Sequence, residues 1–217
     1  MEIGLSKFAT LRGVSLRRAQ AMAESGVIPA RKEGGIWLVD ERAAVARKPS
    51  SRPLSPRMAW AVIEVLSGVS LEHLSPMDLH RGRKYAASVR AAANPIDRLY
   101  SLLRRRSVML DLHVHPDDIP AVAADPRIAK SGISDERSGL SAARELEAYI
   151  AEADRDAFIA MYLLVESSSP NVRLHCVESR PKDPVPIALV IADLIDWNSP
   201  REDGRAHELM SELQWNR

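Results

Sequence analysis

"GVSLRRAQAMAESGVIPARKEGGIWLVD", residues 13–40, decides the fold of the N-terminal part of this chain. Ser15 has the residue type of a helix N-cap, and it precedes a segment, residues 16–25, whose apolar residues recur at helical spacing. Gly26 follows that segment, and glycine commonly ends helices because it tolerates the left-handed conformation. The first half of the stretch therefore predicts a short amphipathic helix after a tight Gly-Val turn.

The second half of the stretch predicts a β-hairpin. Two short β-type segments flank Glu33-Gly34-Gly35, a strong hairpin turn signal, and Ile28, Ile36 and Trp37 are expected in the core of this unit. The expected elements are helices over 6–11, 16–25 and 41–46 and strands over 28–32 and 36–39. Helix, turn, helix, hairpin and helix in fewer than 50 residues predict a small winged helix-turn-helix over residues 1–48.

This arrangement predicts binding to double-stranded DNA. An α-helix fits the major groove with its N-terminal residues near the base edges, and a hairpin wing can lie along the backbone beside it. We expect base-proximal positions for the side chains near the start of the helix, and phosphate or close backbone contacts for the others. The predicted DNA-binding residues are Arg12, Ser15, Arg17, Arg18, Gln20, Arg31, Lys32, Gly34 and Lys48.

The charge distribution agrees with a polyanionic partner. The whole chain has a net charge of only +1, but residues 1–110 hold 19 Lys and Arg against 9 Asp and Glu, whereas residues 111–217 hold 11 against 20. A basic half suits nucleic acid, and an acidic half suits either a basic protein surface or the basic half of the same chain.

The remainder of the chain predicts a linker and a second domain. Residues 49–56 are rich in proline and serine with a cation, which is linker composition, and residues 57–217 carry mixed helix and strand patterns. Expected helices are 57–66, 81–93, 95–106, 116–124, 141–151, 186–197 and 201–213, and expected strands are 108–114, 157–165 and 172–177. The fold class is therefore α+β, a small winged helix-turn-helix followed by a mixed α+β domain.

Catalytic motifs are absent from the sequence, so we expect neither enzymatic activity nor a bound cofactor. Asp111, His113 and His115 alternate on one predicted strand and raise a metal-site hypothesis, but a partly exposed polar strand face is the preferred interpretation. Cys176, the only cysteine, is expected to be a buried apolar residue. The run Arg104-Arg105-Arg106 is expected to be solvated.

Two family resemblances extend this interpretation. Residues 5–46 resemble the winged helix-turn-helix of excisionases and MerR-type regulators, through the Gly-Val-Ser turn, the Arg-bearing helix and the strand containing Trp37. The strings RPLSPRMAWAVIEVLSG, LHVHPDDIPAVAADPR, NVRLHCVES and VPIALVIADLIDWNSPREDGRAHELM resemble, in that order, antitoxins of the AbiEi type from type IV toxin–antitoxin pairs. This resemblance implies a repressor of its own promoter whose C-terminal domain counters a nucleotidyltransferase toxin.

The expected partners are operator DNA and the cognate toxin. Four acids near one helix start, Asp193, Asp196, Glu202 and Asp203, are the candidate partner-binding residues, although the helix dipole also accounts for the last two. A homodimer is left open, because one small winged helix offers few DNA contacts. No apolar run is long enough for a membrane span, and we expect a cytoplasmic protein.

Two alternatives remain. A ligand- or metal-sensing transcriptional regulator would use the Asp111, His113 and His115 face, and an excisionase-like DNA-binding protein of a phage or mobile element would share the N-terminal domain.

Overall fold

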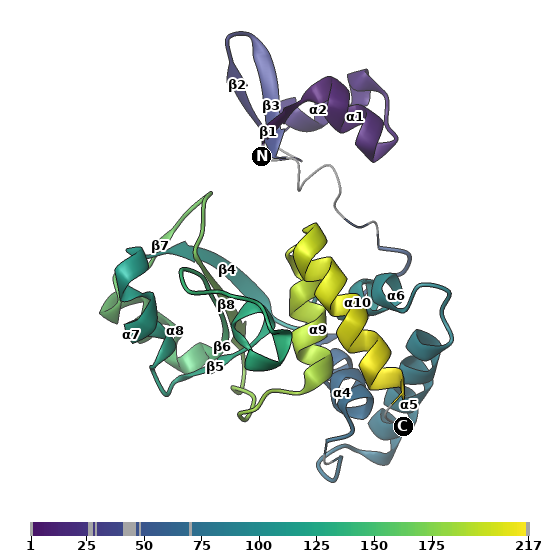
Figure 1. The fold of residues 1–217 in the computed structure, drawn as a ribbon. Coiled ribbons are helices and arrows are strands. Elements are labelled where there is room, and N and C mark those ends of the chain that lie inside the picture. Colours follow the sequence, from purple (N-terminus) through teal and green to yellow (C-terminus); the bar gives the residue numbers. More distant parts are fainter. Residues whose placement is uncertain are drawn as a thin grey trace. The chain divides into compact units, whose positions relative to one another are not determined.

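The computed structural model describes residues 2–25, 28, 30–40, 47, 49–69 and 71–215 (Figure 1). The chain divides into two compact units, Met1–Lys48 and Pro49–Arg217. Both units combine helices with a β-sheet, so the predicted α+β class is confirmed. The boundary between the units coincides with the predicted end of the first domain.

The first unit consists of two helices and a three-stranded antiparallel sheet. Its elements are β1 (Glu2–Gly4), α1 (Leu5–Arg12), α2 (Leu16–Glu24), β2 (Ala30–Glu33) and β3 (Ile36–Asp40). The strand order is β1-β3-β2, and β1 is a strand that the sequence analysis did not predict. Gly13, in the left-handed region with φ of 63°, ends α1 and starts the three-residue turn to α2.

Local sequence explains both the helix start and the hairpin of this unit. The Ser15 hydroxyl accepts a hydrogen bond from the Arg18 backbone N–H at 3.3 Å, which confirms the predicted N-cap. Gly34 and Gly35 both have positive φ, 56° and 83°, as a two-residue type I′ hairpin turn requires. Ile36 follows the turn and is 63% exposed, so its expected core position is wrong.

The core of the first unit lies between its helices and its sheet. It is built from buried residues of both helices and of strands β1 and β3, together with Ile28, and Trp37 packs against it. The predicted helix over residues 41–46 lies outside the described residues, as does Lys48.

The second unit contains a five-stranded sheet of order β5-β6-β8-β4-β7, in which β6 and β8 are parallel and the other neighbours antiparallel. Its strands are β4 (Val108–His113), β5 (Ile128–Lys130), β6 (Leu146–Ala151), β7 (Val165–Glu166) and β8 (Val172–Val177). Its helices are α4 (Pro56–Ser67), α5 (Pro76–Arg90), α6 (Pro95–Leu103), α7 (Ile119–Ala123), α8 (Glu152–Met161), α9 (Ile187–Asp196) and α10 (Pro200–Trp215), with 3-10 turns η1 (Pro116–Asp118), η2 (Gly132–Ser134) and η3 (Glu136–Ser138).

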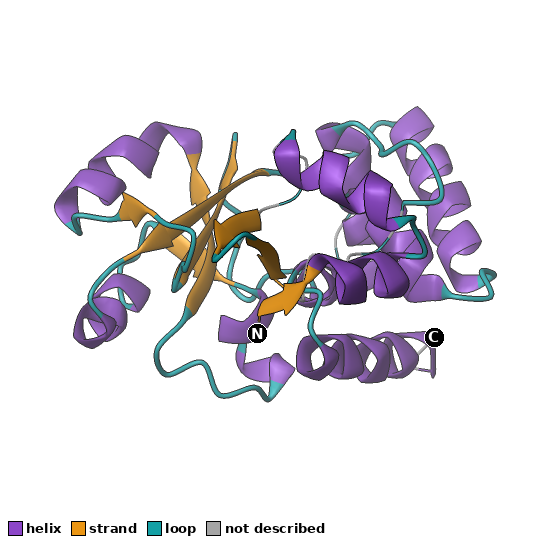
Figure 2. Ribbon diagram, turned by 90° about the horizontal axis from the view of Figure 1, so that it is seen from above, coloured by secondary structure: helices purple, strands orange, loops and turns teal. Residues whose placement is uncertain are grey.

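The sheet of the second unit is covered on both faces (Figure 2). One face packs its apolar residues, such as Leu174 and Cys176, against α7 and α8, so the predicted burial of Cys176 is confirmed. The other face meets the helices α4, α6, α9 and α10, which form the larger core around the almost wholly apolar α9. Because side chains alternate along a strand, the polar residues of β6 and β8 all point toward α9.

Three predictions for the second unit are wrong. Residues 141–151 were expected to be helical but end in the interior strand β6, and residues 157–165 were expected to be a strand but mostly belong to α8. The expected linker, residues 49–56, is bonded to the second unit: the Leu54 N–H donates to the Leu102 carbonyl at 3.0 Å, and the Ser50 N–H donates to Ser101 Oγ at 2.9 Å. Backbone bonds of this kind make the segment part of the second unit.

Candidate functional site

The start of α2 presents two cationic side chains to solvent. Arg17 and Arg18 are exposed in the first turn, while Ala19 and Ala23 of the same helix are buried against the first unit's core. In the described part of the chain, neither guanidinium forms an ion pair with a carboxylate. Both side chains are therefore solvent-exposed charges, and their contact with DNA stays a prediction.

The neighbouring predicted residue on α2 is already engaged. Gln20 is exposed, and its amide Nε2 donates to Glu24 Oε1 at 3.0 Å, one turn further along. Glu24 was not among the predicted site residues, although it shares an exposed side of α2 with Gln20 and Arg17.

The hairpin carries the other predicted contacts. Arg31 makes two hydrogen bonds to the Glu2 carboxylate, at 2.8 and 2.7 Å, and lies 2.6 Å from Glu33, so a phosphate contact by Arg31 has to compete with these acids. Lys32 is exposed and lies 5.7 Å from the ring centre of Trp37, in cation–π geometry. Gly34, at the hairpin tip, has no side chain that would keep the DNA backbone at a distance.

The two remaining predicted cations are Arg12 and Lys48. Arg12, at the end of α1, is half-buried and has a partner within the protein, so it is less available than Arg17. Lys48 lies outside the described residues.

The predicted partner-binding acids of the second unit do not form an exposed docking surface. Asp193 is 0% exposed and Glu202 5% exposed, so the prediction is wrong for both. Glu202 accepts hydrogen bonds from the Ser199 hydroxyl and from Arg201, which makes it part of the N-terminal cap of α10. Asp196 is paired with Arg106, and Asp203 is half-buried at the same helix start.

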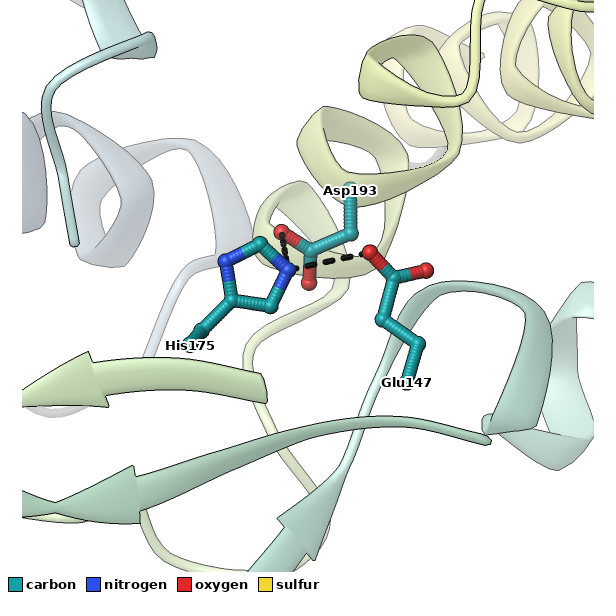
Figure 3. Close-up of side chains that lie close together, drawn as sticks. All are labelled: Glu147, His175 and Asp193. Atoms are coloured by element: carbon teal, nitrogen blue, oxygen red, sulfur yellow. Dashed lines mark hydrogen bonds and ion pairs between the residues drawn. The ribbon is translucent and has the colours of Figure 1, made fainter. Parts of the chain in front are cut away.

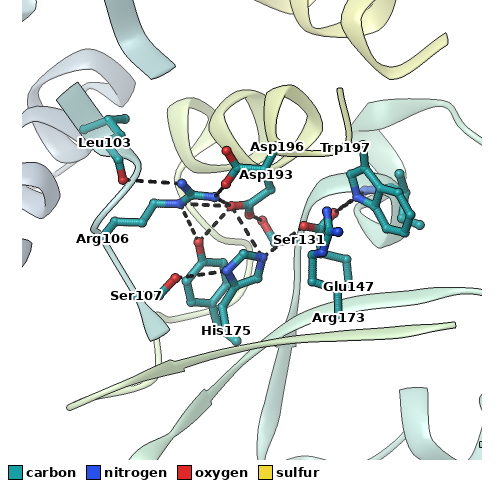
Figure 4. A network of polar contacts seen from close by, with 12 residues as sticks. Leu103, Arg106, Ser107, Ser131, Glu147, Arg173, His175, Asp193, Asp196 and Trp197 are labelled. Carbon is teal, nitrogen blue, oxygen red and sulfur yellow. Dashed lines mark hydrogen bonds and ion pairs between the residues drawn. The ribbon is translucent and has the colours of Figure 1, made fainter. Parts of the chain in front are cut away.

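Asp193 instead belongs to a polar network buried between the sheet and α9 (Figure 4). Arg106, 3% exposed, follows α6 and bonds to Asp193 and, at 2.7 Å, to Asp196 Oδ2. Its Nε also donates to the hydroxyl of Tyr149, which in turn donates to Asp193 Oδ1 at 2.8 Å. The Ser131 hydroxyl donates to the other Asp193 oxygen. The expectation that Arg106 is solvated is therefore wrong.

Burial and charge shift the pKa values within this network. Burial alone would lower the pKa of Arg106, but the neighbouring Asp196, Tyr149 and Asp193 outweigh it and raise that pKa well above its usual value. Burial raises the pKa of the Tyr149 phenol, and Asp193 adds to this shift. Arg106 therefore stays cationic and Tyr149 stays a donor, which matches the hydrogen bonds that they make.

The network continues to a buried histidine and glutamate on the sheet (Figure 3). His175 Nε2 lies 3.0 Å from Glu147 Oε1 and 3.9 Å from Asp193 Oδ1, and its Nδ1 lies 3.0 Å from Ser107 Oγ. The ring stacks on Tyr149 with 4.6 Å between centroids. The second Glu147 oxygen accepts from the Trp197 indole N–H at 2.6 Å.

Glu147, His175 and Asp193 offer ligand atoms within 4.8 Å of one another, so a metal ion has to be considered. These atoms already have protein donors: Asp193 accepts from Arg106, Tyr149 and Ser131, and Glu147 from Trp197 and from the Ile133 N–H at 3.3 Å. The Arg106 guanidinium takes the place beside Asp193 that a cation would need. The geometry thus supports an anchor that fixes α9 on the sheet, rather than a metal centre.

The structure does not support the metal site proposed for Asp111, His113 and His115. Asp111 accepts from Arg173 at 3.0 Å, His113 Nδ1 lies 3.3 Å from the Ser169 carbonyl oxygen, and His115 lies beyond the end of β4, exposed, 3.7 Å from Asp117. The preferred interpretation, a partly exposed polar strand face, is confirmed for Asp111 and His113, whereas His115 is not part of the strand.

Sequence analysis missed the network, although one observation pointed to it. Asp193 lies in the middle of the apolar stretch IALVIADLID, and a carboxylate at such a position is buried at high cost unless a cation meets it. Arg106 is the cation that meets Asp193, but the two residues are far apart in the sequence, so their pairing could not be read from it.

Comparison with known proteins yields no relative. No protein-family model matches the chain, and neither the curated proteins nor the solved structures contain a match. Among the described residues, no helix has the length and apolar character that crossing a membrane requires.

Proposed function

We propose that this protein is a DNA-binding regulator whose first unit is a winged helix-turn-helix. The observation that carries the proposal is the pair Arg17 and Arg18, exposed at the capped start of α2 and without carboxylate partners among the residues that the structure describes. An α-helix that follows a short turn and exposes cations at its N-terminus has the arrangement that helix-turn-helix proteins use in the major groove.

The hairpin supports the same proposal. Strands β2 and β3 are joined by a two-glycine turn, so they form a narrow ribbon whose tip has no bulky side chain. Lys32 is exposed on this ribbon. A ribbon of this kind can lie along a phosphate backbone while α2 occupies the groove.

The test is the affinity of the full chain for duplex DNA. Replacing both Arg17 and Arg18 with alanine is expected to weaken binding by roughly tenfold or more at low salt, because two charged contacts are lost. The matched control is R83A/K84A, which removes two exposed cations from α5 of the second unit. Equal affinities for the R17A/R18A variant and the control would contradict the proposal.

For the second unit we propose the partner that the AbiEi resemblance implies, a nucleotidyltransferase-type toxin, with the protein as its antitoxin and as a repressor of their common promoter. The separation of the chain into two compact units is compatible with two separate tasks. The experiment is co-expression with a nucleotidyltransferase-like protein encoded beside this one. Rescue of growth that survives the R17A/R18A substitutions supports the proposal, and a harmless neighbour or an absence of rescue contradicts it.

A further inference from the structure

The exposed side of α2 carries a row of three polar residues that could recognise DNA bases, in addition to attracting phosphates by charge. With about 100° per residue, Arg17, Gln20 and Glu24 lie along one stripe of the helix, whereas Arg18 points about 100° or more away from each of them. All four are exposed. The stripe has a donor at one end and a carboxylate at the other.

The hydrogen bond within the stripe fixes which groups are left for DNA. A carboxylate can only accept, so the Gln20 amide nitrogen has to face Glu24, at 3.0 Å. Within the described part of the chain, the Gln20 oxygen and the remaining Glu24 oxygen are then acceptors without a partner, and the Arg17 guanidinium is a donor without one.

These groups match base edges in the major groove. Arginine donates to guanine O6 and N7, and a glutamate accepts from the amino group of cytosine. A carboxylate beside phosphates is repelled unless it finds such a donor, so Glu24 lowers affinity for all sequences that lack one. Glu24 thus favours specificity over affinity.

The spacing sets how far apart the two bases lie. Arg17 and Glu24 are seven residues apart, which is roughly 10 Å along the helix axis. With α2 lying lengthwise in the major groove, so that both ends of the helix face bases, this distance corresponds to about three base-pair steps of B-DNA. Resting on the proposed function, we infer that Arg17 and Glu24 are specificity-determining residues, and that the preferred site carries a guanine and, about three base pairs away, a cytosine read by Glu24.

The test begins with selection of the preferred duplex from a random library by the full chain. Affinities are then measured for that duplex and for one in which the C·G pair is replaced by T·A, with wild type, E24Q and E33Q. The E33Q control removes one exposed carboxylate from the hairpin tip of the same unit.

The wild type is expected to lose about tenfold in affinity when the C·G pair is replaced, and E24Q to lose most of that discrimination while binding the replaced duplex more tightly. E33Q is expected to keep the discrimination. Equal discrimination by E24Q and wild type would overturn the inference while leaving DNA binding intact. An absence of any wild-type binding at low salt would instead overturn the proposed function on which it rests.

Discussion

At the scale of single residues, the buried network tolerates little change, and Gly132 is the tightest point. This residue opens η2 with φ of 52°, and a Cβ placed on it would lie 1.8 Å from Glu147 Oε2 and 3.0 Å from the Asp193 Cβ. Both neighbours are held by hydrogen bonds, so neither can move without breaking part of the network. Glycine is required here by space as well as by backbone conformation.

Replacing Gly132 with alanine is therefore expected to lower the free energy of unfolding by about 3 kcal/mol. Gly139 is a matched control, because its φ is 63° but a Cβ there meets nothing within 4 Å. G139A should cost about 1 kcal/mol, from backbone strain alone. Urea denaturation of both variants measures the difference, and equal stabilities would show that the network can relax around a methyl group.

The arginine run gives a second comparison between neighbours. Arg106 is buried against Asp193 and Asp196, whereas Arg105 is exposed. R106A leaves two carboxylates without their cation and is expected to cost roughly 3 to 5 kcal/mol. R105A should change stability by less than about 0.5 kcal/mol. Thermal or urea unfolding tests this, and similar losses for both variants would contradict the burial of Arg106.

At the scale of elements, Asp125 joins α7, β5 and α8 and predicts a dependence on pH. Its carboxylate accepts from Arg127 at 3.0 and 2.6 Å and from the Tyr162 hydroxyl at 2.9 Å. The hydrogen bonds from Arg127 hold the pKa of Asp125 well below its usual value. Because this folded-state pKa lies below the unfolded value of about 3.9, the stabilisation is present above about pH 4 and is lost as the pH falls further.

The D125N variant is accordingly expected to lose about 2 kcal/mol of stability at pH 7 and to change less than wild type between pH 5 and pH 3. D156N is the control, since Asp156 is also paired with an arginine but is 83% exposed. Its unfolding curve should follow that of wild type. An acid transition of D125N parallel to that of wild type would rule out the assigned role of Asp125.

Elements with distinct boundary residues were predictable from the sequence, and ambiguous apolar runs were not. Capping residues and turn glycines placed α2, β3 and the hairpin correctly, and strand β8 was predicted with its observed ends. Residues 141–151 favoured a helix by composition, but pairing with β5 and β8 made their second half the strand β6. Residues 157–165 are apolar enough for a strand, yet they continue a helix that begins with Glu152 and Asp154.

The local geometry of the candidate DNA-binding residues at the start of α2 was predictable, because it depends on neighbours in the sequence. Ser15, Arg17 and Arg18 lie within one helical turn, so their arrangement follows from the helix itself. The buried network was not predictable, since it joins Arg106 to Asp193 across 87 residues of sequence and depends on the packing of α9 on the sheet.

At the scale of the whole molecule, the division of the chain into two units does not coincide with its division into a basic and an acidic half. The change of sign near residue 110 falls inside the second unit, within β4. Counted by unit, residues 1–48 hold 9 Lys and Arg against 5 Asp and Glu, a net +4, and residues 49–217 hold 21 against 24, a net −3. Some carboxylates of the second unit are paired with cations of the same unit, as Asp193 and Asp196 are with Arg106. The first unit as a whole is therefore net positive, but the basic excess of residues 1–110 is shared with the second unit, whose residues 49–110 hold 10 Lys and Arg against 4 Asp and Glu.

The most direct test of the central claim is the salt dependence of duplex DNA binding by the full chain and by its R17A/R18A variant. We predict that the logarithm of the wild-type binding constant falls linearly with the logarithm of salt concentration, and that the variant's slope is shallower by about 1 to 2. Binding that is absent at low salt, indifferent to added salt, or unchanged in slope by the two substitutions would contradict the assignment of α2 as a DNA-binding helix.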